Sequence, residues 1–149
     1  MSDASTLASP SRAATTGMST ATICVADLEH AVADRRAGAV VSFAGVVRDH
    51  DHGRTVTSLT YEGHPSADEV IVAIVAAAHR RPGVIRATAA HRVGLLAVGE
   101  LAFAVAVSSA HRDEAFSTCA WLVEEVKARL PVWKHQLFAD GTTEWVNCA

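Results

Sequence analysis

The feature that most constrains the fold of this chain is the order in which helical and strand-like hydrophobic patterns alternate along it. Three segments have the 3.6-residue period of an amphipathic helix, at 28–37, 66–81 and 111–130. Shorter apolar or alternating segments are typical of strands, at 20–25, 39–47, 55–62, 84–93, 100–110, 133–138 and 143–148. The order β-α-β-β-α-β-β-α-β-β predicts a single-domain α+β fold. In it, helices pack on one face of a mixed or antiparallel sheet, and a doubly wound parallel fold is disfavoured.

Local signals indicate where some of these elements begin and end. Asp27 is a suitable N-cap for the first helix, and Gly38 is expected to end it. The strands at 39–47 and 55–62 flank a polar loop, which predicts that they pair as a hairpin. The glycines that bound 94–99 indicate a turn region between two later strands.

Composition excludes several classes of protein. Half of the 149 residues are apolar and the formal net charge is −3, so we expect one globular domain and no general nucleic-acid binder. The longest apolar run, 70–78, is far shorter than the roughly 20 residues that cross a bilayer. Residues 1–18 lack an apolar signal core and predict a disordered tail ahead of a domain at 19–149. Three widely spaced cysteines favour a reducing, cytoplasmic setting, with Cys119 as a core residue.

The chain has only two lysines, Lys127 and Lys134, and they lie on either side of Pro131. At about 100° per residue, Lys127 falls within roughly 20° of Phe116 around the helix axis. We expect Phe116 to belong to a core-facing stripe, whose members are Phe116, Cys119, Ala120, Val123, Val126 and Leu130. Lys127 in that stripe would have to pair or line a cleft, and the alternative is a lysine that snorkels at the helix end. Lys134, taken alone, is typical of an exposed strand lysine.

Further cations lie at the ends of predicted elements. His111 and Arg112 stand where a buried strand turns into a helix, and the free N–H groups of a helix N-terminus attract anions. Arg48 follows another buried strand. Together with the two lysines, these residues predict a pocket for a phosphorylated or carboxylated ligand. The run at 49–52 contains two histidines at alternate positions, but it offers too few ligands for a closed metal site, so we expect a solvated loop and no metal.

Several separated motifs resemble one known family. They are GAVVSFAGVVRDHDHG, LTYEGHP, HRVGLLAVGE, VSSAHRDEAF and VKARLPVWKHQ, and they span about residues 20 to 147 in the family's order and spacing. The chain closely resembles the large, catalytic subunit of molybdopterin synthase. SAHR at the helix start and KxRxPxWK at its end are the most diagnostic motifs.

The resemblance implies an α/β hammerhead type of fold and a sulfurtransferase activity. The family converts cyclic pyranopterin monophosphate to the molybdopterin dithiolene of the molybdenum cofactor. No cofactor takes part, because the sulfur arrives as a thiocarboxylate on the C-terminal Gly-Gly of a small ubiquitin-like subunit. A central homodimer carries one small subunit at each end, which makes a heterotetramer, and no nucleic acid or membrane is involved.

The resemblance also implies which residues form the site. Lys127 matches the family's catalytic lysine, and Lys134 is expected to assist it. The expected substrate contacts are Val46, Val47, Arg48, His111, Arg112, Lys127, Lys134, His135 and Gln136. Three positions depart from the family pattern: His135-Gln136 stands where Arg-Glu is frequent, and Val46 stands where a lysine is common.

Two other functions share some of these features. A Schiff-base lysine enzyme acting on a phosphorylated carbonyl compound would need the lysine and the anion site, but no protein partner. A non-catalytic module that binds a ubiquitin-like tail would need the partner and no chemistry. For the synthase itself, we favour acid/base and electrostatic roles for Lys127, with covalent catalysis as the alternative.

Overall fold

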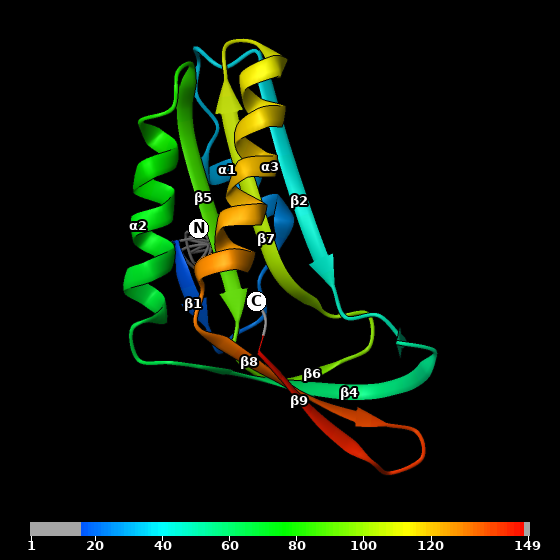
Figure 1. Cartoon of the computed structure of the whole chain (residues 1–149). Coiled ribbons are helices and arrows are strands. Elements are labelled where there is room, and N and C mark those ends of the chain that lie inside the picture. The colour runs from blue at the N-terminus through cyan, green and yellow to red at the C-terminus, as the bar shows by residue number, and fades with distance from the viewer. Residues whose placement is uncertain (1–15, 148–149) are drawn as a thin grey trace, which may run out of the picture.

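Residues 16–147 are described by a computed structural model, and they form two sheets that meet at an angle (Figure 1). The helices are α1 (Val25–Ala31), α2 (Ala67–His79) and α3 (Arg112–Arg129). The strands are β1 (Gly17–Ser19), β2 (Ala39–Val46), β3 (His50–Asp51), β4 (Arg54–Gly63), β5 (Val84–Arg92), β6 (Gly94–Ala97), β7 (Leu101–Ser109), β8 (Val132–Phe138) and β9 (Thr143–Asn147). The expected single-domain α+β class is confirmed.

The first sheet has the strand order β1-β5-β7-β2 and is covered on both faces. Strand β1 runs parallel to β5, and the other pairs are antiparallel. Helices α2 and α3 pack on one face, where Ile71, Ile74, Leu122 and Val126 are fully buried. Helix α1 packs on the opposite face through Leu28. Because both faces are covered, β7 is almost wholly buried and reads as a continuous apolar run.

The second sheet lies across the lower end of the first (Figure 1). Its order is β3-β4-β8-β9, and β6 also pairs with β4. A small core that includes Val47, Leu59, Leu96 and Ala102 joins it to the first sheet. The second sheet is therefore the element that can close a pocket against the end of the first.

Several local expectations were wrong, and tertiary pairing explains them. The helices do not share one face, since α1 lies behind the first sheet. Strand β2 pairs with β7, whereas β4 pairs with β8, so the expected hairpin of 39–47 with 55–62 does not form. Of the two glycines that bound 94–99, Gly99 lies in a turn as expected, but Gly94 is the first residue of strand β6.

The N-terminal segment also differs from expectation. The first strand, at Gly17–Ser19, begins before the expected 20–25 segment and ahead of the expected domain start at 19. Helix α1 begins at Val25 with Cys24 as N-cap, so Asp27 lies in its first turn. The predicted tail at 1–18 lies mostly outside the described residues. No helix within 16–147 is long and apolar enough to cross a membrane.

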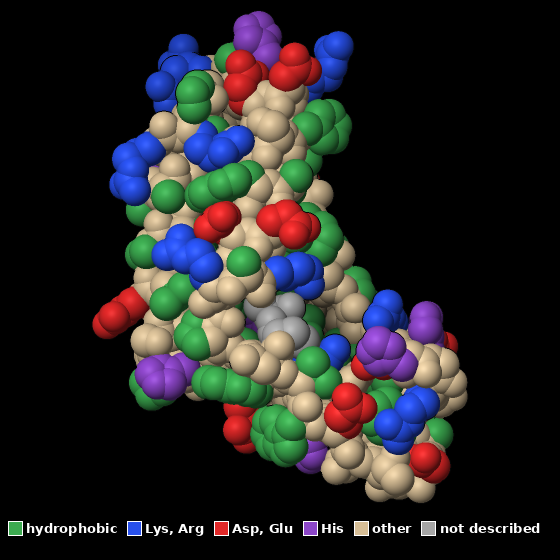
Figure 2. Space-filling view, in the orientation of Figure 1, with side chains coloured by type: hydrophobic (Ala, Val, Ile, Leu, Met, Phe, Trp, Pro, Cys, Tyr) green, Lys and Arg blue, Asp and Glu red, His purple; other side chains and the backbone are tan. Residues whose placement is uncertain are grey.

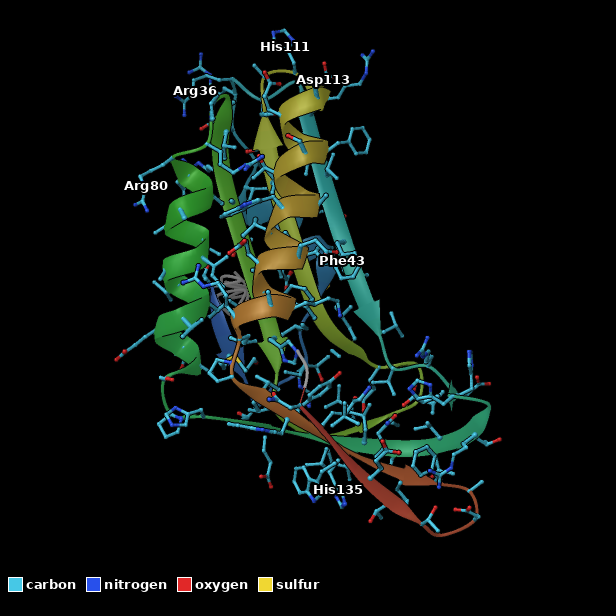
Figure 3. All side chains as sticks on the ribbon, in the orientation of Figure 1. Arg36, Phe43, Arg80, His111, Asp113 and His135 are labelled. Carbon is cyan, nitrogen blue, oxygen red and sulfur yellow. The ribbon has the colours of Figure 1, made fainter. Side chains whose placement is uncertain are left out.

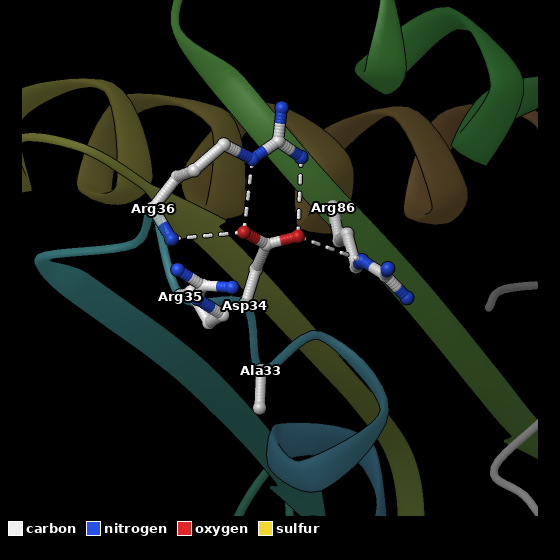
Figure 4. A pocket seen from close by; sticks show the side chains of 5 residues that line it. All are labelled: Ala33, Asp34, Arg35, Arg36 and Arg86. Carbon is white, nitrogen blue, oxygen red and sulfur yellow. Dashed lines mark hydrogen bonds and ion pairs between the residues drawn. The ribbon is translucent and has the colours of Figure 1, made fainter.

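An ion-pair cluster around Asp34 ties the segment after α1 to β5 (Figure 4). The Asp34 carboxylate accepts two hydrogen bonds from the Arg36 guanidinium, at 2.9 and 3.1 Å, and one from the Arg36 backbone N–H at 2.9 Å. Its second oxygen lies 3.4 Å from Nε of Arg86 on β5. The Arg36 side chain holds the pKa of the Asp34 carboxyl well below its usual value.

We predict that Asp34→Asn lowers the thermal unfolding midpoint at pH 7. A carboxyl whose pKa is depressed in the folded protein stabilises the fold above its unfolded pKa, near 3.8, and loses that contribution as the pH falls below it. The difference between variant and wild type should therefore be full at pH 5 to 7 and shrink below pH 3.8. Circular dichroism melts across this range measure it, with Glu62→Gln, an exposed carboxylate on β4, as control. A difference independent of pH would contradict the assignment.

Candidate functional site

A pocket of about 500 Å³ lies where the two sheets meet the C-terminal end of α3. Its lining comes from strands and a helix far apart in the sequence: Gly45, Val46, Val47, Arg48, Leu59, Tyr61, His91, Ala102, Phe103, Lys127, Lys134 and Gln136. Figure 2 shows Lys and Arg side chains around the concave angle between the upper body and the lower sheet. We call this cavity the junction pocket.

The pairing of β4 with β8 builds the floor of the junction pocket. Lys134 lies opposite Tyr61, and Gln136 lies opposite Leu59. Because side chains alternate between the faces of a strand, all four point to the same face of the sheet. His135 therefore points to the other face, where its ring stacks on Trp145 of β9 at a centroid distance of 4.4 Å (Figure 3). His135 was an expected substrate contact, but the structure places it outside the junction pocket.

The end of β2 supplies the opposite wall. The β2–β7 register shifts between Gly45 and Val46, and such a bulge bends a strand and redirects its side chains. Val46 is exposed and Val47 is buried, and both line the pocket. Arg48 follows them into the pocket with its side chain largely exposed.

Asp51 holds two of the pocket residues in place, a role that the sequence analysis missed. Its carboxylate is buried, accepts a hydrogen bond from the Gln136 amide at 2.7 Å and lies 3.2 Å from the Arg48 guanidinium. The Gln136 hydrogen bond keeps the pKa of the Asp51 carboxyl below its usual value, and the charges of His52, Lys134 and Arg48 add to the effect. The run at 49–52 is therefore partly a strand with a buried anchor. Among the described residues, no three His, Cys, Asp or Glu side chains are placed to share a metal ion.

Helix α3 brings Lys127 to the pocket, although not in the expected way. The buried face of α3 is formed by Ala115, Thr118, Cys119, Leu122, Val123 and Val126. Phe116, expected in the core, is 59% exposed, and Lys127 is also exposed. The reason is that α3 packs against α2 as well as against the sheet. This packing turns Thr118 inward, where its hydroxyl accepts a hydrogen bond from Nε of Arg81. Lys127 thus lies on the flank of the buried face, at the rim of the junction pocket.

His91 is a second pocket residue that the sequence analysis did not single out. It is the residue before the last in β5, is 0% exposed, and lines the junction pocket between Tyr61 and Phe103. Burial lowers the pKa of His91 to about 4, and the charge of Lys127 acts in the same direction. The sequence signal was a histidine directly after the small apolar pair Ala89-Ala90 in a predicted strand, which is also the usual appearance of an ordinary core histidine.

His111 and Arg112 lie at the other end of α3, beside a separate surface hollow that includes Gly38 and Asp113 (Figure 3). His111 is the N-cap of the helix, and its carbonyl accepts a hydrogen bond from the Ser109 hydroxyl. At 1.5 Å per residue, the sixteen steps from His111 to Lys127 span roughly 24 Å. We had expected this pair to share one pocket with the two lysines. Within one chain, the distance excludes that arrangement.

The junction pocket is suited to an anion. Arg48, Lys127 and Lys134 supply three cations, and Asp51 supplies one carboxylate, so the net charge is positive. Tyr61, His91 and Phe103 form an aromatic wall beside those cations. This arrangement fits a compound with a flat ring system and a negatively charged group.

Comparison with known proteins gives a consistent family. The family model described as MoaE protein matches residues 18–129. The molybdopterin synthase catalytic subunit of Pyrococcus abyssi is 42% identical over 111 residues, covering 74% of this chain and 75% of that protein. The corresponding subunit of Thermoplasma volcanium is 35% identical over 120 residues, covering 80% of this chain and 88% of that protein.

A solved structure has the same fold. The crystal structure of molybdopterin synthase from Staphylococcus aureus matches with a TM-score of 0.82 at 28% identity, covering 89% of this chain and 96% of that one. The family model covers most of the described residues, including the junction pocket up to Lys127. The chain therefore belongs to the MoaE protein family.

Proposed function

We propose that this chain is the catalytic subunit of a molybdopterin synthase and that the junction pocket is its active site. It transfers sulfur from a thiocarboxylate on a small ubiquitin-like subunit to cyclic pyranopterin monophosphate and so forms the molybdopterin dithiolene. The single observation that carries the proposal is the convergence of Arg48, Lys127 and Lys134 on one pocket in a member of this family.

The charges of the pocket match the charges of the reactants. The substrate phosphate and the thiocarboxylate are both anions, and fixed cations draw them together and offset the loss of their hydration. Arg48 is oriented by Asp51, which makes it a suitable phosphate contact. Lys134 faces the same cavity from β8 and adds a second fixed charge.

Lys127 is the residue that we assign to proton transfer. In each sulfur transfer, the thiocarboxylate sulfur forms a C–S bond to a substrate carbon, and a C–O bond at that carbon breaks, so that its oxygen departs with a proton or stays on the phosphate. Water then cleaves the C–S bond to the tail, which is left as a carboxylate. These steps move protons, and an amine at the rim of the pocket is placed to give and accept them. Because the partner supplies the sulfur, the proposed reaction needs no bound cofactor. The cytoplasmic location of the protein stays a prediction.

A homodimer would complete the site with His111 and Arg112. Strand β2 is an edge strand of the first sheet, and Val40, Val46 and Phe116 are exposed apolar side chains on β2 and α3. In a two-fold dimer with antiparallel α3 helices, the start of α3 in one copy lies near its end in the other. The roughly 24 Å that separate the pair from Lys127 within a chain would then be spanned by the second copy.

We predict that Lys127→Ala lowers molybdopterin formation by about 100-fold or more, because a general acid/base contributes on the order of 10²–10⁴. The assay combines purified chain, thiocarboxylated partner and the pterin precursor, and chromatography checks that the complex still assembles. Arg129→Ala is the matched control, since it removes a cation two residues away that bonds Glu125 and does not line the pocket.

Three results would contradict the role of Lys127 or favour another function. Turnover near the wild-type rate in Lys127→Ala would show that Lys127 is not catalytic. Borohydride trapping of a carbonyl substrate on Lys127 without the partner would favour a Schiff-base enzyme. Partner binding with no product from the wild type would favour a non-catalytic tail-binding module.

A mixed dimer tests the shared site. In a dimer of one Lys127→Ala copy and one Arg112→Ala copy, a shared design places both substitutions in one site and leaves the other site intact. We predict about half of the wild-type turnover for the mixed dimer, and little for either homodimeric variant. Differently tagged copies, purified in tandem, provide the sample. A mixed dimer as inactive as its parents would contradict a site that Lys127 of one copy shares with Arg112 of the other.

A further inference from the structure

His91 has a fixed orientation in the wall of the junction pocket. Its ring packs edge-on to Tyr61 at a centroid distance of 4.8 Å and stacks with Phe103 at 5.6 Å. Strand β5 holds its backbone beside β7, where His91 pairs with Phe103. The ring is therefore held between Tyr61 and Phe103 at the edge of the cavity.

The hydrogen bonds of His91 determine which ring nitrogen carries the proton. Nδ1 lies 2.7 Å from the backbone carbonyl of Arg92, and a carbonyl oxygen only accepts hydrogen bonds, so Nδ1 carries the hydrogen. In a neutral ring, Nε2 is then a bare acceptor. Burial keeps the pKa of His91 at about 4, so the ring is neutral at pH 7.

Nε2 of His91 is buried and has no hydrogen-bond partner among the described residues. A buried polar atom without a partner costs stability, and such atoms are rare in folded proteins. This one belongs to a side chain that lines the junction pocket, next to its cations. Because His91 borders this cavity, a ligand that fills the cavity and displaces the atoms covering Nε2 would supply the missing donor.

The other polar side chains around the cavity supply mostly donors. Arg48, Lys127 and Lys134 can only donate when charged. The amide nitrogen of Gln136 is occupied by Asp51. An anion satisfies the cations but offers nothing to His91, so the pocket distinguishes a bare anion from an anion attached to a ring that bears N–H or O–H groups.

We propose that His91 is a specificity-determining substrate contact, whose Nε2 accepts a hydrogen bond from an N–H or O–H group of the pterin ring system. The proposal rests on the proposed function, because that function supplies the ligand. Phosphate recognition then belongs to Arg48 and the lysines, and ring recognition belongs to His91 with the aromatic wall of Tyr61 and Phe103.

Binding of two ligands by two variants tests the proposal. His91→Phe keeps an aromatic ring and removes the acceptor, whereas His91→Gln keeps an acceptor near the position of Nε2. By calorimetry on the full chain, we expect His91→Phe to weaken cyclic pyranopterin monophosphate binding about tenfold or more, and His91→Gln to restore much of it. Inorganic pyrophosphate, used as a probe of the cations alone, should bind all three proteins within about twofold.

Ser108→Ala is the matched control. Ser108 on β7 also has a buried polar atom without a partner among the described residues, but it does not line the junction pocket. Its removal should leave the affinity for both ligands unchanged. A loss of pterin affinity in Ser108→Ala comparable to that of His91→Phe would assign the effect to general loosening of the fold and overturn the proposal.

Other results would also overturn the proposal. They are equal pterin affinity in His91→Phe and wild type, or an equal loss for the pterin and pyrophosphate. If His91→Phe does not fold, the ¹⁵N chemical shift of His91 Nε2 in the wild type decides. It should change when the pterin is added and remain unchanged when pyrophosphate is added. A wild type that makes molybdopterin while His91→Phe binds normally refutes only this inference, whereas a wild type that neither binds nor converts the pterin refutes the proposed function.

Discussion

The turn at Leu130-Pro131 is the constraint on which the site depends. Helix α3 ends there because Leu130 adopts an extended conformation and proline cannot continue a helix. The Pro131 carbonyl accepts a hydrogen bond from the His64 N–H at 2.9 Å, which ties this turn to the segment between β4 and α2. Leu130 and Val132 are buried on either side. The turn thereby passes the chain from α3, which packs on the first sheet, to β8 of the second sheet across Leu130 and Pro131, and it brings Lys127 and Lys134 to one cavity.

The charged residues of the junction pocket lie partly at its floor and partly at its exposed rim. Arg48 and Gln136 are anchored by the buried Asp51 carboxylate, so the floor of the pocket keeps its shape without a ligand. Lys127 lies at the exposed rim, where its long side chain reaches the cavity from the end of α3. The neutral His91 ring beside these cations avoids adding a further positive charge. The pocket thus separates charge recognition from ring recognition.

The sequence predicted the local elements better than their partners. The long helices and the buried strand β7 have strong periodic patterns, and they appear close to their expected positions. Strand pairing depends on contacts between distant segments, so the expected hairpin gave way to the β2–β7 and β4–β8 pairs. The same limit applied to α3, whose buried face shifted from Phe116 to Leu122 because α2 packs beside it. The helical periodicity of α3 alone carries no information about α2, so it could not predict this shift.

The same limit applies to the site residues: local signals predicted some of them, and those that depend on distant contacts were missed. Element ends predicted Arg48 and Lys127, and both line the junction pocket. Strand alternation separates Lys134 from His135, but only the register with β4 decides which of them faces the cavity. His91 and Asp51 were missed because their importance comes from burial and partners that the sequence does not display.

A crystal structure of the chain with cyclic pyranopterin monophosphate tests the account most directly. The account predicts the ligand in the junction pocket, with its phosphate at the cations and a ring donor within hydrogen-bond distance of His91 Nε2. Density for the ligand elsewhere, such as beside the arginines around Asp34, with the junction pocket holding only water, would contradict it.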